Sequence, residues 1–474
     1  MKYISTRAGA PDLDFEEVLL TGLARDGGLY VPENWPQFSE SDIKNLRGLS
    51  YSEVAVKVIH PFVRDVIPEF ELKLLVNDTY QKFNHSAIAP IKQLGPNQWL
   101  TELFHGPTLA FKDYPLQLVG RLFDYVLKKR KNRITIIGAT SGDTGSAAIE
   151  ACKDKNSIDV FIMHPKNRVS EVQRRQMTTV KSSNIYNIAL DGTFDDCQDM
   201  VKDLFADQNF RDNHNLSAIN SINWARIMGQ IVYYFWTAIS LGAPDRKFIY
   251  AVPTGNFGNV YAGYAAKQMG LPIDKFIIGS NENNILTRFF APDNIKGRMS
   301  MSPVLKTLSP SMDIQVSSNF ERLLFDSFDR NGRAVANALE GLRKKQTIEF
   351  GEQSWSKMSK TFQGISLSNE ETKASIIDIY KSTGELLDPH SVIGLMAGKK
   401  VKNMDDSIVV SLATAHPAKF PDTVKDATDI YPNLPAHLSD LFDRDESFTE
   451  LPNNIDTIRD FINKKLEEKP INDY

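Results

Sequence analysis

Short runs of consecutive apolar residues alternate with helical patterns through the middle of the chain. The runs are rich in β-branched residues and typical of buried strands; they cover residues 133–139, 158–165, 185–192, 247–253, 275–280 and 407–414. Segments with the apolar spacing of an amphipathic helix follow several of them. Strands that alternate with helices in this way form open parallel sheets with helices on both faces. The pattern therefore predicts an α/β fold.

The amino-terminal stretch has a helical pattern instead, which continues to about residue 85. Asp14 is expected to cap its first helix, and the pair Gly27-Gly28 is expected to end it. The apolar face of that helix would carry Phe15, Val18, Leu19 and Leu23.

The carboxyl-terminal stretch is acidic and rich in Pro, Asp and Asn up to about residue 454, and then becomes helical. One face of this last helix carries Ile455, Ile458, Phe461, Ile462 and Leu466. An apolar stripe of this kind is typical of a helix that docks on the rest of the protein.

Composition and charge narrow the classes of function. The chain has 474 residues, a net charge of −4 and a pI near 6.1. At about 150 residues per domain, this length suggests about three domains. The charge excludes the broad basic surface of a nucleic-acid binder and offers nothing to anionic lipids. We therefore expect a soluble protein that binds neither nucleic acid nor membranes.

The cysteines and the start of the chain bear on location. The two cysteines, Cys152 and Cys197, are far apart, which fits a reducing compartment. The start has no apolar segment like that of a secretory signal, and no run reaches the roughly 18 apolar residues of a membrane span. The sequence thus predicts a cytoplasmic protein.

Two glycine-rich loops, at residues 140–145 and 254–259, share one design. Each follows a predicted strand and leads into a predicted helix. Ligands of open α/β sheets bind at the carboxyl ends of strands, where backbone N–H groups and the helix dipole favour an anion. Each loop is thus a candidate site for a phosphate or carboxylate. The structural alternative is a tight strand-to-helix turn.

Other common motifs do not fit this chain. The spacing after Gly138 is G-x-x-x-G-x-x-G, which matches neither a dinucleotide fingerprint nor a P-loop. The sequence lacks H-E-x-x-H, a cysteine/histidine metal spacing and a G-x-S-x-G elbow. We therefore predict no metal site and no serine-hydrolase chemistry.

Lys112 is the candidate nucleophile, although most lysines lie at the surface. It follows Pro-Thr-Leu-Ala-Phe, a context that could hold its amine in an apolar pocket. Desolvation lowers the pKa of a lysine, which a Schiff-base lysine requires. A phosphate-binding loop together with such a lysine indicates pyridoxal phosphate as the cofactor.

Several motifs, spread over nearly the whole chain, resemble those of one family. They are STRAGAPDLDFEEVLLTGLARDGGLYVPENWP (5–36), HGPTLAFKDY (105–114), GATSGDTGSAA (138–148), NSINWARI (220–227), PTGNFGN (253–259) and ATAHPAKF (413–420). The chain is similar to the threonine synthases of the longer type found in many bacteria and fungi. The second and third motifs joined to the first make the resemblance specific.

The resemblance implies a fold-type-II, tryptophan-synthase β-like pyridoxal-phosphate enzyme with two open, mostly parallel sheets and an amino-terminal helical domain. An amino-terminal helical domain is expected at 1–85, and a large cofactor-binding domain in two segments is expected at 86–125 and 236–420. A small substrate-side domain is expected at 126–235, and a tail with a docking helix at 421–474.

The resemblance also implies roles for individual residues. Lys112 would hold the cofactor covalently, and Thr414 would bond the pyridine nitrogen. The cofactor phosphate would be bound by the backbone of Gly255, Asn256, Phe257, Gly258 and Asn259. Gly258 is further expected to need a backbone conformation that a β-branched residue disfavours.

The substrate side is implied in the same way. The loop at 140–145 would take the substrate carboxylate, with Thr140, Ser141, Asp143 and Thr144 as its side chains. Asn223 and Arg226 are the candidates for the substrate phosphate. For these residues and for Thr414, the alternative is a packing or turn role.

The implied reaction is a β,γ-replacement in which O-phospho-L-homoserine and water give L-threonine and phosphate. Lys112 would carry protons during this reaction. A phospho-lyase of the same family, giving 2-oxobutanoate, is one alternative. A serine or threonine dehydratase on the same fold, which needs no phosphate-binding arginine, is another. A non-catalytic phosphate or nucleotide binder would give Lys112 no role. The sequence does not disclose the oligomeric state.

Overall fold

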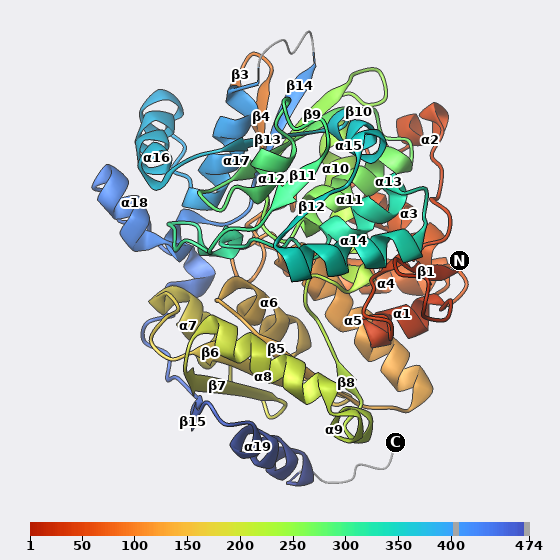
Figure 1. Cartoon of the computed structure of the whole chain (residues 1–474). Helices are drawn as coiled ribbons and strands as arrows, with labels where there is room; N and C mark the ends of the chain where they lie inside the picture. Colours follow the sequence, from red (N-terminus) through yellow and green to blue (C-terminus); the bar gives the residue numbers. More distant parts are fainter. Residues whose placement is uncertain (402–406, 469–474) are drawn as a thin grey trace. The chain divides into compact units, whose positions relative to one another are not determined.

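The structure, a computed structural model, describes residues 1–401 and 407–468 (Figure 1). The chain divides into two compact units, each made from two segments. Unit 1 comprises Met1–Pro115 and Ser221–Asn433, and unit 2 comprises Leu116–Asn220 and Leu434–Tyr474. The four-part division expected from the sequence stays a prediction, because a compact unit can contain more than one domain.

Unit 1 is built on a six-stranded sheet with the order β13-β10-β9-β14-β4-β3. Its strands are β3 (Ile91–Gly95), β4 (Gln98–Glu102), β9 (Phe248–Pro253), β10 (Ile273–Ser280), β13 (Phe362–Ser366) and β14 (Ile408–Ala413). All neighbours are parallel except β3, which runs antiparallel to β4. The strands predicted at 247–253, 275–280 and 407–414 are therefore confirmed.

Helices cover both faces of this sheet. Ala251 of β9 belongs to an apolar cluster with Ala397 of α17 (Pro389–Lys399). The preceding residue, Tyr250, donates a hydrogen bond of 2.9 Å to the carbonyl of Tyr234 in α10 (Trp224–Ser240). Because successive side chains of a strand point to opposite faces, α17 and α10 lie on opposite sides. The α/β architecture is thus confirmed.

The remaining elements of unit 1 are mostly helices. They are α1 (Phe15–Thr21), α2 (Glu40–Asn45), α3 (Tyr51–Val63), α4 (Glu69–Tyr80), α11 (Gly258–Gln268), α12 (Ile285–Phe289), α13 (Phe320–Ser327), α14 (Gly332–Lys345), α15 (Glu352–Ser359), α16 (Asn369–Thr383) and α18 (Pro421–Thr428). Two antiparallel ribbons pair β1 (Tyr3–Ser5) with β2 (Tyr30–Pro32), and β11 (Arg298–Ser300) with β12 (Thr347–Glu349). Short 3₁₀ turns are η1 (Pro310–Met312) and η2 (Pro417–Lys419).

The first helix begins as predicted and ends earlier. Asp14 caps α1, and its side chain exchanges hydrogen bonds with Glu17 in a capping box. The helix ends at Thr21, because Gly22 takes φ +67°. The prediction that it runs to Gly27-Gly28 is wrong, and Leu23 lies outside it with 41% of its surface exposed. Residues 1–85 also contain the ribbon β1–β2 and are not helical throughout.

Unit 2 is built on a five-stranded parallel sheet with the order β15-β7-β6-β5-β8. Its strands are β5 (Ile134–Ala139), β6 (Ile158–Pro165), β7 (Ile185–Asp191), β8 (Leu216–Ser217) and β15 (Thr449–Pro452). Its helices are α6 (Asp143–Cys152), α7 (Glu171–Thr178), α8 (Phe194–Ala206), α9 (Gln208–Asn213) and α19 (Ile455–Glu467), with the 3₁₀ turn η3 (Ala436–Leu438). The strands predicted at 133–139, 158–165 and 185–192 are confirmed. Helix α5 (Asp113–Arg130) begins in unit 1 and continues into unit 2.

The last helix docks as the sequence predicts. Ile458 and Ile462 of α19 are fully buried in the core of unit 2, together with Phe161 of β6. The strand before it, β15, pairs in parallel with β7. The carboxyl-terminal stretch thereby adds both a strand and a helix to unit 2.

Candidate functional site

Two neighbouring strands at the centre of the unit 1 sheet bring the predicted cofactor residues together. β9 and β14 are parallel and in register from Phe248 opposite Ile408 to Ala251 opposite Ser411. The glycine loop at 254–259 follows β9 directly, and Thr414 follows β14. Both therefore emerge at the carboxyl edge of the sheet, where open α/β folds bind ligands.

Lys112 lies at the same edge. The N–H of Phe111 donates to the carbonyl of Thr414 at 2.8 Å, and Ala110 forms a β-bridge with Ala415. Lys112 is 9% exposed, and its Nζ lies 5.5 Å from the centre of the Phe111 ring. The backbone thus fixes the candidate lysine beside Thr414.

Asp113 shapes the turn that leads into Lys112. Its carboxylate accepts hydrogen bonds from the backbone N–H of Thr108 at 2.8 Å and from the Thr108 hydroxyl at 2.7 Å. The turn holds Leu109 at φ +64°. Asp113 was not predicted to have this role, although it directly follows Lys112 in the same motif.

The glycine loop enters α11 through an unusual residue. Phe257 takes φ +62° and ψ +1°, and caps α11 without a side-chain hydrogen bond. Its buried ring packs against Phe320 and Phe362. The first amides of α11 therefore have no side-chain acceptor at the cap, which suits an anionic ligand.

The predicted conformational requirement at Gly258 is wrong, because the positive φ falls at Phe257. What distinguishes the glycines is the space around them. A Cβ at Gly258 would lie 3.3 Å from Nδ2 of Asn319, whereas a Cβ at Gly255 would lie 2.5 Å from the carbonyl oxygen of Ser311. Gly255 is thus the position where a side chain cannot be accepted without moving backbone.

Asn259 supplies a buried polar atom that fits a bound anion. Its Oδ1 accepts hydrogen bonds from the hydroxyls of Tyr233 at 2.7 Å and Tyr234 at 3.0 Å. Within residues 1–401 and 407–468, its buried Nδ2 has no hydrogen-bond partner. A buried donor without an acceptor costs free energy, and a phosphate oxygen would satisfy it. The loop therefore fits the phosphate of the implied cofactor.

Thr414 is fixed by its backbone and is 5% exposed. Its N–H donates to Oγ of Ser391 in α17 at 2.9 Å, and its carbonyl accepts from Phe111. In the described part of the chain, its hydroxyl makes no hydrogen bond to protein. The hydroxyl is thus available to a ligand at this edge.

Asn223 and Arg226 both belong to unit 1, at the start of α10. Asn223 is fully buried and caps the helix, accepting from the N–H of Ala225 at 3.0 Å and donating to the carbonyl of Leu19 at 2.9 Å. Arg226 is 3% exposed, and burial lowers its pKa to about 10, so that it stays charged at neutral pH. A Cβ at Gly258 would lie 3.6 Å from Cδ1 of Ile227. The first turn of α10 therefore lies beside the glycine loop.

The loop at 140–145 follows β5 in unit 2. Thr140 organises it, because its hydroxyl oxygen accepts from the N–H groups of Gly142 at 3.0 Å and Gly145 at 2.8 Å. Gly142 takes φ +136°, a conformation that favours glycine. Asp143 is buried and accepts from Nε2 of Gln173 at 2.8 Å.

The four side chains predicted for this loop therefore differ in their surroundings. Thr140 and Asp143 are buried and take part in the loop's own hydrogen bonds, whereas Ser141 and Thr144 are half-buried. The loop lies at the carboxyl end of β5, between β6 and β8 in the sheet.

Sequence reasoning also missed a charged cluster near the turn of Lys112. Glu102, at the end of β4, accepts from Nε2 of His105 at 2.6 Å and pairs with Nζ of Lys92 at 2.7 Å. Burial alone would raise the pKa of Glu102, but these two partners outweigh it and hold the pKa below its ordinary value. Burial lowers the pKa of His416, two residues after Thr414, to about 4.

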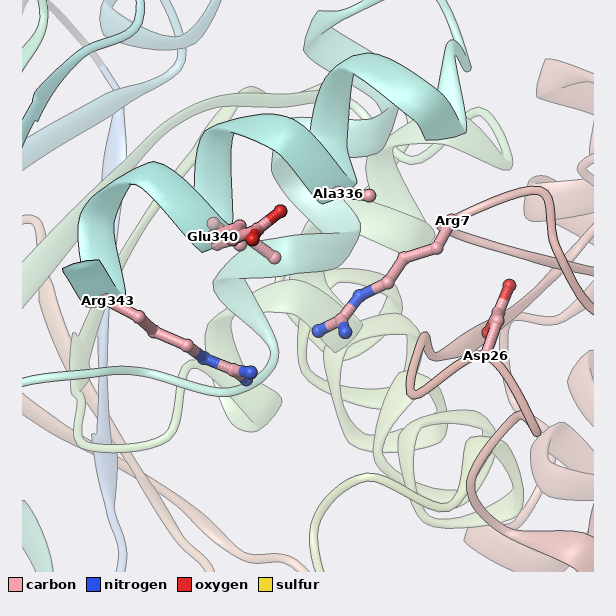
Figure 2. A pocket seen from close by; sticks show the side chains of 6 residues that line it. Arg7, Asp26, Ala336, Glu340 and Arg343 are labelled. Carbon is pink, nitrogen blue, oxygen red and sulfur yellow. The ribbon is translucent and has the colours of Figure 1, made fainter.

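A separate cavity in unit 1, of about 330 Å³, lies between the amino-terminal segment and α14 (Figure 2). Its lining residues are Arg7, Asp26, Ala336, Leu339, Glu340 and Arg343. Arg7 is paired with Glu321 at 2.8 Å, and Glu340 is paired with Lys344 at 2.6 Å. None of the predicted site residues lines this cavity.

Within 1–401 and 407–468, His, Cys, Asp and Glu side chains form no group of three or more that could hold a metal ion. Over the same residues, every helix is too short or too polar to cross a membrane.

Comparisons with known proteins give one consistent family. Residues 2–80 match the model of the threonine synthase N terminus, residues 85–343 that of pyridoxal-phosphate-dependent enzymes, and residues 391–462 that of the threonine synthase C-terminal region. A threonine synthase from Pseudomonas aeruginosa is 53% identical over 98% of both chains. The crystal structure of a PLP-bound threonine synthase from Brucella melitensis is 49% identical, covers 98% of this chain and 99% of its own, and superposes with a TM-score of 0.95. That of yeast threonine synthase is 38% identical, covers 99% of both chains and has a TM-score of 0.92.

Proposed function

The chain belongs to the threonine synthase family of pyridoxal-phosphate-dependent enzymes, and on that basis we propose that it converts O-phospho-L-homoserine and water to L-threonine and phosphate. One observation carries the residue assignment. A buried lysine, a glycine loop and a threonine emerge at the same edge of one sheet, with Phe111 bonded to Thr414 at 2.8 Å.

The cofactor residues of this proposal all lie in unit 1. Lys112 holds the cofactor, and Gly255, Asn256, Phe257, Gly258 and Asn259 bind its phosphate, mainly through backbone N–H groups. Thr414 bonds the pyridine nitrogen with its hydroxyl. Bound pyridoxal phosphate supplies an electron sink for the negative charge left on carbon when a proton is removed. A threonine cannot hold the ring nitrogen protonated as a carboxylate would, so this sink is a mild one.

The proposal also assigns the substrate residues. The loop at 140–145 binds the substrate carboxylate, with Ser141 and Thr144 supplying hydroxyls and Thr140 and Asp143 holding the loop in shape. Arg226, supported by the helix cap Asn223, binds the substrate phosphate. A dianion is costly to desolvate unless a cation pairs with it, and Arg226 stays charged although it is buried.

Lys112 is also the proton carrier of this proposal. Its Nζ, as a free amine, accepts the protons that leave the α- and β-carbons of the substrate. It returns two protons to carbon before threonine is released, one to the γ-carbon, which becomes the methyl group, and one to the α-carbon.

Product analysis tests the proposed reaction. The holoenzyme is incubated with O-phospho-L-homoserine, and phosphate, threonine and 2-oxobutanoate are all quantified. We expect threonine and phosphate in a ratio of one to one. Phosphate with 2-oxobutanoate and no threonine would make the protein a phospho-lyase, and no phosphate release would contradict both reactions. Turnover of unphosphorylated serine or threonine at a comparable rate would instead indicate a dehydratase.

A cytoplasmic location is part of the same proposal. Cys152 and Cys197 are both free and fully buried, and burial raises the pKa of each thiol to about 12. Thiols that are neither paired nor reactive suit a reducing compartment.

A further inference from the structure

The segment just before α13 holds the backbone of the glycine loop. The carbonyl of Asn256 accepts from the backbone N–H of Asn319 at 3.1 Å and from its Nδ2 at 3.0 Å. The carbonyl of Gly255 accepts from the hydroxyl of Ser317 at 2.6 Å. Two consecutive carbonyls of the loop are thus bound by one short segment.

Holding these carbonyls also fixes the direction of two amides. In a trans peptide the C=O and the following N–H point in opposite directions. Because Ser317 and Asn319 bind the carbonyls of Gly255 and Asn256, the N–H groups of Asn256 and Phe257 point away from that segment. Successive amides aimed to one side form the anion-binding concavity that a phosphate requires.

Arg322 orients the side chain that completes this support. It lies in the first turn of α13, is fully buried, and donates from Nη1 to Oδ1 of Asn319. An amide whose oxygen is bound by a guanidinium must present its NH₂ group on the other side, here to the carbonyl of Asn256. Arg322 thereby determines which atom of Asn319 faces the loop.

The other two nitrogens of the Arg322 guanidinium donate to distant parts of unit 1. Nε donates to the carbonyl of Tyr30 in β2 at 3.0 Å, and Nη2 donates to the carbonyl of Ile222, just ahead of α10, at 2.6 Å. Burial lowers the pKa of Arg322 to about 10, which leaves it charged at neutral pH. Burying a cation is costly, and the hydrogen bonds of Arg322 to three oxygens offset part of this cost.

The residue before Arg322 in α13, Glu321, makes a second connection to the amino-terminal segment. Glu321 accepts from Nε and Nη2 of Arg7 at 2.9 and 2.8 Å, and from the hydroxyl of Thr6 at 2.6 Å. Helix α13 is therefore bound to the amino-terminal segment through Glu321 and Arg322, and it contacts the glycine loop through Asn319.

We propose that Asn319 and Arg322 are positioning residues for the cofactor-phosphate loop, and that through them the amino-terminal segment supports cofactor binding. Neither side chain needs to touch the cofactor. Arg322 fixes the amide of Asn319, and Asn319 fixes the peptide group between Asn256 and Phe257. This inference rests on the proposed role of the glycine loop in binding phosphate.

The substitution Asn319→Asp tests it with little change of shape. The carboxylate keeps an oxygen for Arg322 and adds an ion pair, so the fold should persist. It replaces the donor to the Asn256 carbonyl by an acceptor, so the loop loses one bond and gains a repulsion. We expect the dissociation constant of pyridoxal phosphate, titrated into the apoenzyme, to rise about tenfold or more. Arg322→Lys keeps the charge but cannot reach three oxygens, and should also weaken the binding.

Tyr3→Phe is the matched control. It removes a buried hydrogen bond of 2.9 Å to the carbonyl of Phe62 in the same amino-terminal region without touching the loop. We expect the thermal midpoint to fall while the dissociation constant stays as in the wild type. Equal weakening of cofactor binding by Tyr3→Phe and Asn319→Asp would overturn the inference, since a general loss of stability would explain both.

Gly255→Ala separates this inference from the function on which it rests. It forces the loop to move through Ser311, independently of Asn319. Weaker cofactor binding in Gly255→Ala and Asn319→Asp together supports the inference. Weaker binding in Gly255→Ala alone overturns the inference and leaves the loop as the phosphate site. Unchanged binding in Gly255→Ala contradicts the loop's proposed role itself.

Discussion

Lys112 is buried beside Thr414, although a lysine ordinarily keeps its amine in water. If it holds the cofactor and carries the protons, Lys112→Ala should lose the covalent attachment and lower kcat by about 10³-fold or more. Absorbance in the visible range and steady-state kinetics measure the two effects. Lys128→Ala, which removes an exposed lysine of α5, should change neither. Wild-type turnover in Lys112→Ala would contradict the assignment.

His416 makes a pH-dependent contribution to stability. Its Nδ1 accepts from the N–H of Ala418 at 3.1 Å, and burial lowers its pKa to about 4. The unfolded chain has a histidine pKa of about 6.5, so it binds more protons than the folded chain between pH 6.5 and 4. The contribution is therefore complete above pH 6.5 and is lost as the pH falls towards 4.

The charged groups that act on His416 are His105, Glu102, Asp388 and Lys419. His416→Asn keeps an acceptor for the N–H of Ala418 and removes the titration. Between pH 7 and pH 5 the wild type should lose about 2 kcal/mol more than the variant. Thermal midpoints of both proteins at the two pH values measure this. An equal loss in both would show that His416 is not the titrating group.

The proposed cofactor residues were chosen from contiguous sequence motifs, and their roles stay predictions. Lys112 and Thr414 stand in such motifs, and the structure brings them to one edge. Asn319 and Arg322 could not be predicted. Their contacts join residues that are 63 and 292 positions apart in the sequence. An asparagine at a helix cap or an arginine in the first helical turn gives no local signal for such a partner.

At the scale of elements, the structure of the glycine loop replaces the sequence-based expectation for Gly258 with a different prediction. Gly258 needs no unusual φ, and a Cβ added there would lie 3.3 Å from Nδ2 of Asn319 and 3.6 Å from Cδ1 of Ile227, both of which are side-chain atoms. A Cβ added at Gly255 would lie 2.5 Å from the carbonyl oxygen of Ser311. Gly255→Ala should therefore raise the dissociation constant of pyridoxal phosphate about tenfold or more, and Gly258→Ala should raise it much less. Titration of the two apoenzymes measures this, and the reverse order would contradict the packing argument.

The strands show which elements a sequence pattern can reveal. The six predicted strands are buried on both faces, so they appear as continuous apolar runs. Strands β3 and β13 were missed because they are short and largely half-exposed or exposed. The end of α1 was misplaced because Leu23 continues the apolar spacing, whereas the helix is ended by the positive φ of Gly22.

At the scale of the whole molecule, both units are assembled from separate segments of the chain. The sheet of unit 1 takes strands from before and after the first segment of unit 2 in the sequence. Unit 2 takes β15 and α19 from near the end of the chain (Figure 1). Local patterns predict each element but carry no signal for such pairings. The order of strands in the sheets was accordingly beyond the sequence analysis, whereas their parallel direction was not.

The docking of α19 predicts that the end of the chain stabilises unit 2 selectively. Ile462 is fully buried in the core that contains Phe161 and Leu204. Ile462→Ala should leave a cavity and cost about 2–5 kcal/mol, whereas Lys464→Ala at an exposed position should cost little. Because the glycine loop belongs to unit 1, cofactor affinity should persist while hydrogen exchange in β7 and α8 accelerates. Exchange that rises equally in β9 and α17 would mean that the two units unfold as one, and the selective role of α19 would be wrong.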